Sequence, residues 1–487
     1  MKARNVLEWL LYAGGGAYVL LFLFAAMLRL MYPYEVEWNE GAVLDHAIRV
    51  LQGKPIYASP SLDFSAFVYT PIYYYLTALV MKIGGVGLWS GRLISILSTL
   101  GTAIIAGRIV HRETASSVLT FTSFALYIAF YHVTGFFYDI VRMDALALLL
   151  VAVSIYAAMY SRRGYLVTAS FAALAYFTKQ QMFFIVPAIA IGLAFRDKKQ
   201  AMWFSIVSVT LIFMGTVMLN WETSGWYRFY TMTIPGIKAT KDFSWITALE
   251  FFPKWVFSTL GMFTLVPLVG IAMLGKKSLQ GHWPILWAAS VMALISSALS
   301  IGNFGGYQNV FMPLLMMITI VFPLSINAIG EALPELRGLA NAITLLGFLS
   351  LMYNPLGEKM LFASARQQQA GDEFIAKLKS IQGEVWIPFH GYINTLAEKT
   401  AHVHYMAMND ALVPNDTTSA RFQHEIDSSL AAHRFSAIIL DEQKVFQWDS
   451  VAHYVPSSKI FSVPNVFISR IGEAATRPDL IYLPGHE

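Results

Sequence analysis

Residues 1–30 read "MKARNVLEWLLYAGGGAYVLLFLFAAMLRL", and residues 34–57, which follow almost directly, read "YEVEWNEGAVLDHAIRVLQGKPIY". The first stretch is apolar over the length that a helix needs to cross a bilayer. It lacks a clear small-x-small cleavage site, so we expect a retained first membrane span and not a removed signal peptide. The second stretch places several carboxylates beside the membrane. This order predicts both the fold class and the position of a candidate site.

The composition of the whole chain agrees with a membrane protein. Of its 487 residues, 56% are hydrophobic and only 13% are charged, whereas a soluble domain carries about 25% charged residues. Trp and Tyr cluster at the ends of apolar segments, as interfacial belts do. The net charge of +4 gives no indication of nucleic-acid binding. The absence of cysteine excludes disulfides and thiolate catalysis.

The pattern of apolar runs predicts about eleven transmembrane helices. Eleven runs fall near residues 7–30, 88–110, 114–134, 143–160, 164–178, 182–195, 201–220, 254–274, 284–301, 310–329 and 338–353. A further run, 69–84, is ambiguous. If it lies on the membrane as an interfacial helix and the N-terminus is inside, the inner turns "GRIVHRE", "SRRG", "FRDKKQ", "GKKS" and "PELRG" all carry Lys or Arg, as the positive-inside rule expects. The outer loops also contain basic residues, so the rule favours this topology without proving it.

The character of the chain changes after residue 354. The short strand-like runs "GEVWIPF" and "FSAIILDE" alternate there with helical patterns such as "ARFQHEIDSSLAAHRF". We expect a transmembrane module over residues 1–354 and a small α/β domain over residues 355–487. An odd number of spans places that domain on the extracytoplasmic side.

The acidic stretch predicts a short helix after the first span. Asn39 is a suitable N-cap, and Gly53 followed by Pro55 is a suitable stop, so we expect a helix over residues 40–52 with Glu40 in its first turn. The helix dipole stabilises a carboxylate at that place in its ionised form. Glu40 could therefore act as a general base or hold a substrate hydroxyl, or it could merely complement the dipole.

The neighbouring acids have different expected roles. Glu37 is the second candidate for the base. Asp45 and Arg49 are spaced for a local ion pair on the helix, and Glu35 is expected on a solvated face. Gly41, next to Glu40, would leave room for a substrate to approach.

Three further ionisable groups lie where helices re-enter the bilayer from the outer side. These are Asp139, Arg142 and Asp144 in "GFFYDIVRMDALALLL". A fourth group, Lys179, lies in the next outer turn, "AYFTKQQMFF". Ionisable groups at such depth usually face an interior cavity, where they would meet a substrate. The alternatives are an Asp139–Arg142 pair that anchors a helix end and a Lys179 that reaches the surface. Arg92, at the start of the second span, is a weaker case of the same kind.

Two other outer segments offer binding groups. The loop "NWETSGWYRFYTMTIPGIKATKDFSW" combines Arg228, Lys238 and Lys241 with aromatic residues, which suits a lipid phosphate and a sugar or an acyl chain. An ordinary interfacial belt has the same composition. The turn "NFGGYQNVF" contains Tyr307 and Asn309 and could offer backbone N–H groups to an anion.

Metal and nucleotide chemistry find little support in the sequence. The histidines of the C-terminal part include the H-x-H pair His402 and His404, together with His390 and His424. An H-x-H pair can bind zinc, but no third-ligand spacing accompanies it, so no metal site is assigned and the dependence on a divalent metal stays open. No P-loop, G-x-G-x-x-G or G-x-S-x-G motif occurs in a suitable context.

The order of these motifs resembles that of a known superfamily. A first span is followed by an acidic loop of the form "NEG…LxGKPIY", then by "VYTPIYYYLTALVMKIGGVGLWSGRLISIL", "VRMDALALLL" and "LAYFTKQQ". This resembles the C-type (GT-C) membrane glycosyltransferases, and among them the bacterial relatives of protein O-mannosyltransferase and of lipid A aminoarabinose transferase. The resemblance covers residues 7–200 well and residues 200–355 loosely.

The resemblance implies an integral membrane transferase that inverts the sugar configuration. Its donor would be a sugar on a polyprenyl phosphate, and its acceptor a lipid, a glycan or a protein. The location would be the plasma (inner) membrane, with multiple spans and with the site on the extracytoplasmic side. The sugar, the acceptor and the oligomeric state are not specified by the sequence.

The resemblance also assigns roles to individual residues. The catalytic Asp-Glu pair of the family falls on Asn39 and Glu40, so its Asp is missing here and the base is left open between Glu40 and Glu37. Asp144 matches the acid at the start of the fourth span. The family's Pro-Pro-hydrophobic-Tyr helix matches residues 70–73.

Further assignments concern substrate binding. Tyr69 stands where the family often has a basic residue before those prolines, and Tyr73 ends the motif. Binding of the donor phosphate is therefore assigned to loop cations. The candidate cations are Lys179, Arg228, Arg142, Lys238 and Lys241, and the remaining candidate substrate contacts are Asp139, Tyr69, Tyr73, Tyr307 and Asn309.

Two other classes of protein compete with this interpretation. A transporter or flippase of lipid-linked sugars would show repeats and broken helices near the bilayer midplane, and neither is clear in this chain. A polysaccharide polymerase or ligase would use a similar donor at the outer face but usually has more basic loops.

Overall fold

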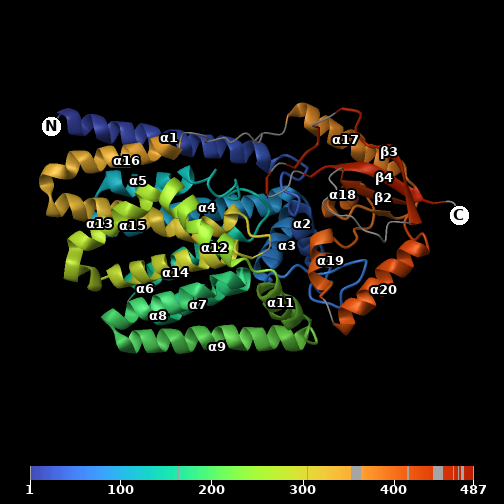
Figure 1. The fold of residues 1–487 in the computed structure, drawn as a ribbon, viewed down its shortest axis with the longest axis horizontal. Helices are drawn as coiled ribbons and strands as arrows, with labels where there is room; N and C mark the ends of the chain where they lie inside the picture. Colours follow the sequence, from blue (N-terminus) through green and yellow to red (C-terminus); the bar gives the residue numbers. More distant parts are fainter. Residues whose placement is uncertain are drawn as a thin grey trace.

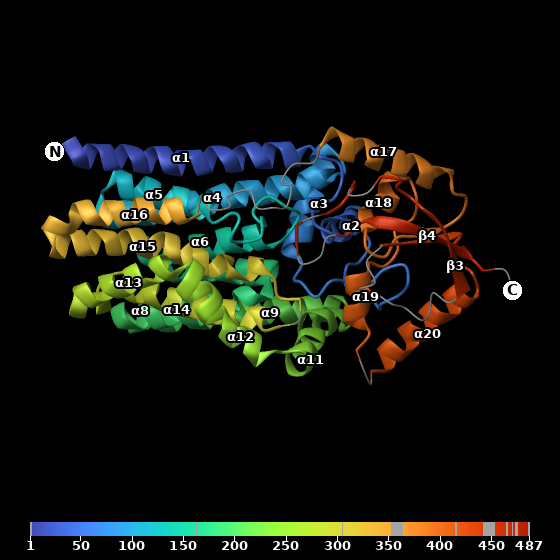
Figure 2. The ribbon, with the colours of Figure 1, turned by 45° about the horizontal axis from the view of Figure 1, so that its top comes forward.

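The computed structural model describes residues 2–161, 164–303, 305–351, 364–413, 416–441, 453–463, 466–469, 471–472 and 476–485. It consists of a long helix bundle with a smaller α/β part at one end (Figures 1 and 2). The N-terminus lies at the opposite end of the bundle, together with the turns that join α8 to α9, α13 to α14 and α15 to α16. This architecture confirms the predicted fold class, a multi-pass helical membrane protein with a small C-terminal α/β domain.

The bundle is built from long and short apolar helices. They are α1 (Lys2–Leu30), α4 (Leu88–Thr114), α5 (Ser117–Ala129), α6 (Asp144–Tyr160), α7 (Gly164–Thr178), α8 (Ile185–Arg196), α9 (Lys198–Glu222), α13 (Gly261–Leu274), α14 (Trp283–Ile301), α15 (Met312–Ala332) and α16 (Arg337–Leu351). Within the described residues, six helical segments are long and apolar enough to cross a membrane, namely Val6–Leu30, Leu88–Thr114, Lys198–Glu222, Gly261–Leu279, Trp283–Ile301 and Gln308–Ala332. Four more apolar helices of the bundle, α5 to α8, are shorter, so the number eleven stays a prediction.

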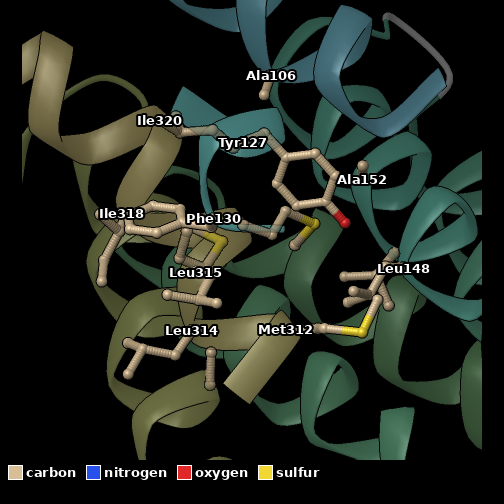
Figure 3. Packing of buried hydrophobic residues seen from close by; sticks show 14 of the residues in the cluster. Ala106, Tyr127, Phe130, Leu148, Ala152, Met312, Leu314, Leu315, Ile318 and Ile320 are labelled. Carbon is tan, nitrogen blue, oxygen red and sulfur yellow. The ribbon is translucent and has the colours of Figure 1, made fainter. Parts of the chain in front are cut away.

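The core of the bundle forms around α15. This helix is apolar on all sides, and such a helix is stable only when it is surrounded. Figure 3 shows Met312, Leu315 and Ile318 of α15 among side chains of neighbouring helices, including Phe130 and Leu148. All five side chains are buried. Because α4, α5 and α6 pack on this centre, their ends are held in fixed positions relative to one another.

Short helices lie between the bundle and the C-terminal part (Figures 1 and 2). They are α2 (Glu40–Leu51), α3 (Ile72–Gly84) and α11 (Ile234–Lys241). Two other short helices are α10 (Trp226–Arg228), which contacts α9, and α12 (Trp245–Phe251), which packs against α14 within the bundle. The predicted helix 40–52 is confirmed as α2, and the apolar run 69–84 forms α3, which packs beside α2 and not within the row of long helices. The side chain of Asn39 does not cap α2 as expected; its amide donates to Glu37 Oε1 over 3.1 Å.

The C-terminal part is a four-stranded sheet with helices around it. Its helices are α17 (Ala365–Ser380), α18 (Gly391–Leu396), α19 (Tyr405–Ala411) and α20 (Thr417–Ala431), and its strands are β1 (Val385–Trp386), β2 (Ala437–Asp441), β3 (Tyr454–Lys459) and β4 (Pro478–Pro484). The strand order is β1-β2-β4-β3, with β1 parallel to β2 and the other pairs antiparallel. The predicted α/β character is confirmed. The predicted boundary at residues 354 and 355 lies outside the described residues.

The C-terminal part rests on the segment between α1 and α4. Buried side chains of α2, such as Val43, join one apolar cluster with Tyr392 and Phe422 of the C-terminal part. Main-chain bonds reinforce this contact, because the Val403 amide donates to the Leu62 carbonyl over 2.9 Å. The two parts therefore share a core, and this core fixes the position of one part relative to the other.

Candidate active site

A cavity of about 400 Å³ lies where the bundle meets the C-terminal part. Its wall combines charged, amide and aromatic side chains from segments that are far apart in the sequence. The residues that line it include Glu37, Trp38, Asn39, Tyr69, Phe137, Arg142, Lys179, Gln180, Gln181, Asn303, Tyr307, Asn309, Met406 and Gly472. Six of the residues that the sequence singled out as candidates therefore share one cavity: Glu37, Tyr69, Arg142, Lys179, Tyr307 and Asn309.

Glu37 is the carboxylate of this wall. Its side chain is only 2% exposed, and Asn39 donates to it from the main chain over 3.2 Å and from the side chain over 3.1 Å. Burial raises the pKa of Glu37 to about 7, although the nearby Arg142 and the bonds from Asn39 oppose this rise. A carboxyl group with a pKa near the working pH can both accept and release a proton.

Arg142 is the cation next to Glu37. Its Nη1 lies 3.7 Å from Glu37 Oε2, and its Nη2 donates to the Tyr69 hydroxyl over 3.3 Å. Its guanidinium also faces the rings of Tyr69 and Phe137. Within the described residues, its buried Nε and Nη1 atoms have no hydrogen-bond acceptor. Buried donors without acceptors are costly, so this side of Arg142 is suited to an anionic ligand.

Lys179 is the second cation of the cavity, at the end of α7. Its Nζ lies 2.6 Å from Asp144 Oδ1, at the start of α6, and the amide of Asn309 donates to the same oxygen over 3.0 Å. Asp144 is buried and does not line the cavity. It therefore holds in place Lys179 and Asn309, two residues that line the cavity. We expected Lys179 to meet an anion, and in the structure that anion is the carboxylate of Asp144.

The C-terminal part closes the cavity with Met406 and Gly472. The Ile471 amide donates to the Val36 carbonyl over 3.0 Å, which brings Gly472 next to Glu37. Gly472 has a φ of +97°, and a Cβ there would lie 3.4 Å from Glu37 Cγ. Positive φ disfavours other residues at this position, so glycine permits the chain to pass close to the carboxylate.

Glu40 has a different position from the one that the sequence suggested. It is fully buried and does not line the cavity. Arg92 donates to both of its oxygens, over 2.9 Å from Nε and 2.8 Å from Nη2, and the amides of Val36 and Val141 donate to it as well. Burial alone would raise the pKa of Glu40, but the charge and hydrogen bonds of Arg92 hold it below the ordinary value. Glu40 is thus bound to Arg92 inside the protein, and Glu37 is the acid among the residues that line the cavity.

The space beside Gly41 is also taken. A Cβ at Gly41 would lie 1.8 Å from Glu35 Oε1 and 2.9 Å from the Tyr392 main chain. The glycine therefore admits Glu35 and α18, and not a substrate. Glu35, expected on a solvated face, is buried, and its Oε2 lies 2.7 Å from His390 Nδ1. Both expectations were wrong because the C-terminal part covers this loop.

Two local ion pairs that the sequence allowed are not formed, and Asp139, a candidate substrate contact, is buried and does not line the cavity. Asp139 pairs with Arg29 over 2.8 Å and accepts from the Tyr131 hydroxyl over 2.7 Å, and not from Arg142. Arg49 donates to the Pro55 carbonyl over 2.6 Å. In the part of the chain that the structure describes, it makes no ion pair with Asp45, which is half-buried near Glu35 and α18. Asp139 thus pairs with a residue far from it in the sequence. Arg49 bonds to a main-chain carbonyl and not to the carboxylate on the same helix.

The remaining candidates lie outside the cavity. Arg228 is exposed on α10, and Lys241 lines a separate small pocket beside α19 together with Lys238, which pairs with Asp410. Tyr73 is buried in α3, and its hydroxyl donates to the Gly91 carbonyl over 3.0 Å. The structure does not bring these side chains to Glu37, and of the five candidate cations Arg142 and Lys179 are the two that line the cavity.

Several residues of the wall were not among the sequence candidates, including Trp38, Gln180 and Gln181. Trp38 lies between two acids that were considered, and Gln180 and Gln181 follow Lys179 directly. The amide of Gln180 bonds to the Val68 carbonyl, and that of Gln181 to Ser300. The sequence did contain a signal for Gln180 and Gln181. Both amide side chains directly follow a lysine in a turn with almost no loop. For Met406 and Gly472 the sequence carried none.

The described residues contain no group of three or more His, Cys, Asp or Glu side chains that could hold a metal ion. The H-x-H pair is split, because His402 faces Asp63 over 3.5 Å while His404 packs against the ring of Trp38.

Comparisons with known proteins agree with the predicted class. Residues 68–221 match the family model of dolichyl-phosphate-mannose-protein mannosyltransferases. The structure is similar to ArnT from Cupriavidus metallidurans bound to undecaprenyl phosphate, with 10% sequence identity, a TM-score of 0.61, and coverage of 97% of this chain and 98% of that one. It is also similar to the archaeal oligosaccharyltransferase AglB from Archaeoglobus fulgidus in complex with an inhibitory peptide and a dolichol-phosphate, with 10% identity, a TM-score of 0.50, and coverage of 87% and 69%. No curated protein matches the chain in sequence.

The chain thus has the fold of the C-type glycosyltransferases, a class of multi-pass membrane proteins. The predicted resemblance to this superfamily is confirmed at the level of the fold. The likeness to ArnT runs over nearly the full length of both chains and therefore includes the C-terminal α/β part.

Proposed function

We propose that this protein transfers a sugar from a polyprenyl-phosphate donor to an acceptor hydroxyl at the extracytoplasmic face of the plasma membrane. The observation that carries the proposal is the pairing, in one cavity, of Glu37 with the cations Arg142 and Lys179. Transfer from a lipid phosphate needs a group that accepts a proton and groups that neutralise the departing phosphate. The similarity to ArnT, which was solved with undecaprenyl phosphate, supports a donor of this kind.

The proposed reaction is a direct displacement with inversion. Glu37 takes the proton of the acceptor hydroxyl, whose oxygen forms a bond to the anomeric carbon of the sugar. The bond between that carbon and the phosphate oxygen breaks, and its electron pair leaves with the polyprenyl phosphate. The added negative charge is stabilised by the free donors of Arg142 and by Lys179. The net products are the glycosylated acceptor, polyprenyl phosphate and one proton.

Neighbouring side chains have supporting roles in this proposal. Asn39 orients the carboxylate of Glu37 through two hydrogen bonds, and Asp144 orients Lys179. Trp38 and Tyr307, which line the cavity, offer aromatic faces on which a sugar ring can pack. Positioned groups of this kind lower the entropy cost of bringing donor and acceptor together.

The experiment that tests the proposal uses purified protein in detergent and a radiolabelled polyprenyl-phosphate sugar. A transferase releases unlabelled polyprenyl phosphate and places the label on an acceptor. A flippase, reconstituted in vesicles, moves the intact donor between leaflets and leaves it uncleaved, and that outcome would overturn the proposal. Mass spectrometry of lipid-linked sugars and glycans from cells that lack the protein would then identify the acceptor and separate a transferase from a polymerase or ligase.

Two further measurements test the location and the metal dependence. The chain has no cysteine, so a single cysteine at Ser161 or Ser380 is a clean reporter. We expect labelling of the first only from the cytoplasmic side and of the second only from the outside; labelling from the same side would contradict the proposed topology. Activity after EDTA treatment, with and without added Mg²⁺ or Mn²⁺, tests whether a divalent metal assists the reaction.

A further inference from the structure

A second hollow lies between α4 and α5, at the end of the bundle opposite the C-terminal part. Its volume is about 650 Å³. Three basic side chains of α4 line it, namely Arg108, His111 and Arg112. Ile104, in the same wall, is 52% exposed, so the hollow opens on the outside of the bundle, where membrane lipid surrounds the protein.

The two arginines of this hollow form no ion pair among the residues that the structure describes. In the part of the chain that the structure describes, no carboxylate lies within 4.0 Å of Arg108 or Arg112. The neighbouring Glu113 is engaged elsewhere, because it accepts from the Tyr160 hydroxyl over 2.6 Å and lies 2.8 Å from His282. Like charges four residues apart on a helix repel each other, so an external anion would stabilise this arrangement.

Arg112 is held in place before any ligand arrives. Its guanidinium lies over the rings of Tyr156 and Tyr160, at 5.2 Å and 4.6 Å from their centroids. Cation–π contacts fix the position of the charge without neutralising it. His111 is oriented in a similar way, since its Nδ1 lies 3.2 Å from Thr120 Oγ1. Two of the three basic side chains, Arg112 and His111, are therefore already positioned at the hollow.

The apolar and polar residues of the hollow follow one order along the membrane normal. On α4, Ile104 lies seven residues before His111, which is on the order of 10 Å deeper in the bundle. On α5, which runs in the opposite direction, Phe121 and Phe124 follow Ser117 in the same sense. Both walls are thus polar at the end of the bundle and apolar further in, which matches the order of a lipid headgroup and its acyl chain.

We propose that this hollow binds an anionic glycerophospholipid of the surrounding leaflet. The lipid phosphate meets Arg108, His111 and Arg112, and one acyl chain lies against Ile104, Phe121 and Phe124. Basic pockets between transmembrane helices at the cytoplasmic side are suited to such headgroups. The site is separate from the cavity at Glu37 and does not depend on the proposed transferase activity.

The test measures lipid binding to the purified protein by native mass spectrometry. Dioleoyl phosphatidylglycerol and dioleoyl phosphatidylcholine carry the same acyl chains and differ in headgroup charge. We expect preferential retention of phosphatidylglycerol, and a loss of roughly tenfold or more in its affinity for the Arg108→Gln/Arg112→Gln double variant, because charge-assisted contacts are lost. The matched control is Lys198→Gln/Lys199→Gln, two exposed lysines at another turn of the same end, which should bind as the wild type does.

A second variant separates loss of the site from loss of the fold. Ser117 is exposed at the first turn of α5, where a carboxylate favours the helix. Ser117→Glu should therefore fold at least as well as the wild type and still reject phosphatidylglycerol. Equal retention of the two lipids, or unchanged binding in the arginine and Ser117 variants, would overturn the proposal. So would competition by inorganic phosphate at equal concentration, since that result would assign the site to a small anion.

Discussion

The carboxylate of Glu37 lies 3.7 Å from the guanidinium of Arg142, at the wall of a cavity that three regions of the chain build together. Glu37 comes from the segment between α1 and α2, and Arg142 from the turn before α6. Gly472 of the C-terminal part passes beside the carboxylate. An acid with a pKa raised to about 7 next to a buried cation is the arrangement that a proton-accepting group and an anionic leaving group require.

Glu37→Gln should reduce turnover by about 10²–10⁴, the usual contribution of a general base, while the donor still binds. The amide keeps the shape of the side chain but cannot take a proton. The measurement is the rate of sugar transfer at saturating donor, with donor affinity determined separately. Glu398→Gln is the matched control, because that side chain is exposed in the C-terminal part. An active Glu37→Gln enzyme would exclude Glu37 as the base.

The pH profile gives the same residue a second test. Because burial raises the pKa of Glu37 to about 7, the carboxylate is protonated below that pH and ionised above it. The transfer rate of the wild type should rise with pH through about 7 and then level off. The residual rate of Glu37→Gln should lack this rise. A group with an ordinary carboxyl pKa would give a rate that is already constant over this range.

Glu40→Gln should act on stability more than on turnover. Removing its charge leaves Arg92 buried without a counter-ion, which costs about 3–5 kcal/mol in comparable buried pairs. We expect a lower thermal unfolding midpoint, partial recovery in the Glu40→Gln/Arg92→Met double variant, and a smaller loss of turnover per folded molecule than for Glu37→Gln. A stable Glu40→Gln protein without activity, beside an active Glu37→Gln protein, would instead support Glu40 as the base.

Lys179→Met should weaken donor binding about tenfold or more, since a hydrogen bond to a charged group contributes about 1.5–3 kcal/mol. Binding of a polyprenyl phosphate to the purified variant is the measurement. Arg228→Met is an informative comparison, because Arg228 was a sequence candidate but is exposed outside the cavity. Its affinity should stay close to that of the wild type. The reverse order of effects would place the phosphate near α10.

The contact between the C-terminal part and the first outer loop should depend on pH through His390. Burial alone would lower the pKa of His390, but Asp441 at 3.2 Å and Glu35 at 2.7 Å raise it to about 10. The charged ring therefore contributes stability that is complete below its unfolded pKa of about 6.5 and is lost as pH rises toward 10. The stability difference between wild type and His390→Gln should narrow over that interval. His424→Gln, at an exposed position, should show no such change.

The fold class was predictable because its signals are local. The lengths of the apolar runs, the basic turns and the change of composition after residue 354 are properties of short segments. A bilayer strictly limits which segments can cross it. The helix α2 and the C-terminal strands follow from the same kind of pattern, since capping, stop signals and alternation act between near neighbours.

The candidate site was only partly predictable, because its residues meet across the fold. The sequence identified Glu37, Arg142 and Lys179 as chemically suited groups, but it ranked Glu40 above Glu37. Position at a helix start was the reason for that ranking. Arg92, 52 residues further along the chain, donates hydrogen bonds to both oxygens of Glu40 in the folded protein. No sequence pattern near either residue predicts this pair.

The sequence by itself thus determined that this is a multi-pass membrane protein with an acidic loop after its first span, basic turns between spans and a C-terminal α/β part. Only the tertiary structure decided which carboxylate faces a cavity, which cation stands opposite and which part of the chain closes the wall. The physical reason is that hydrophobic periodicity is a property of neighbouring residues in the sequence. A buried charge, by contrast, is stabilised by a partner that the packing of the fold brings within a few ångströms. Glu40 with Arg92 and Glu35 with His390 are fixed by such packing, and it leaves Glu37 at the cavity.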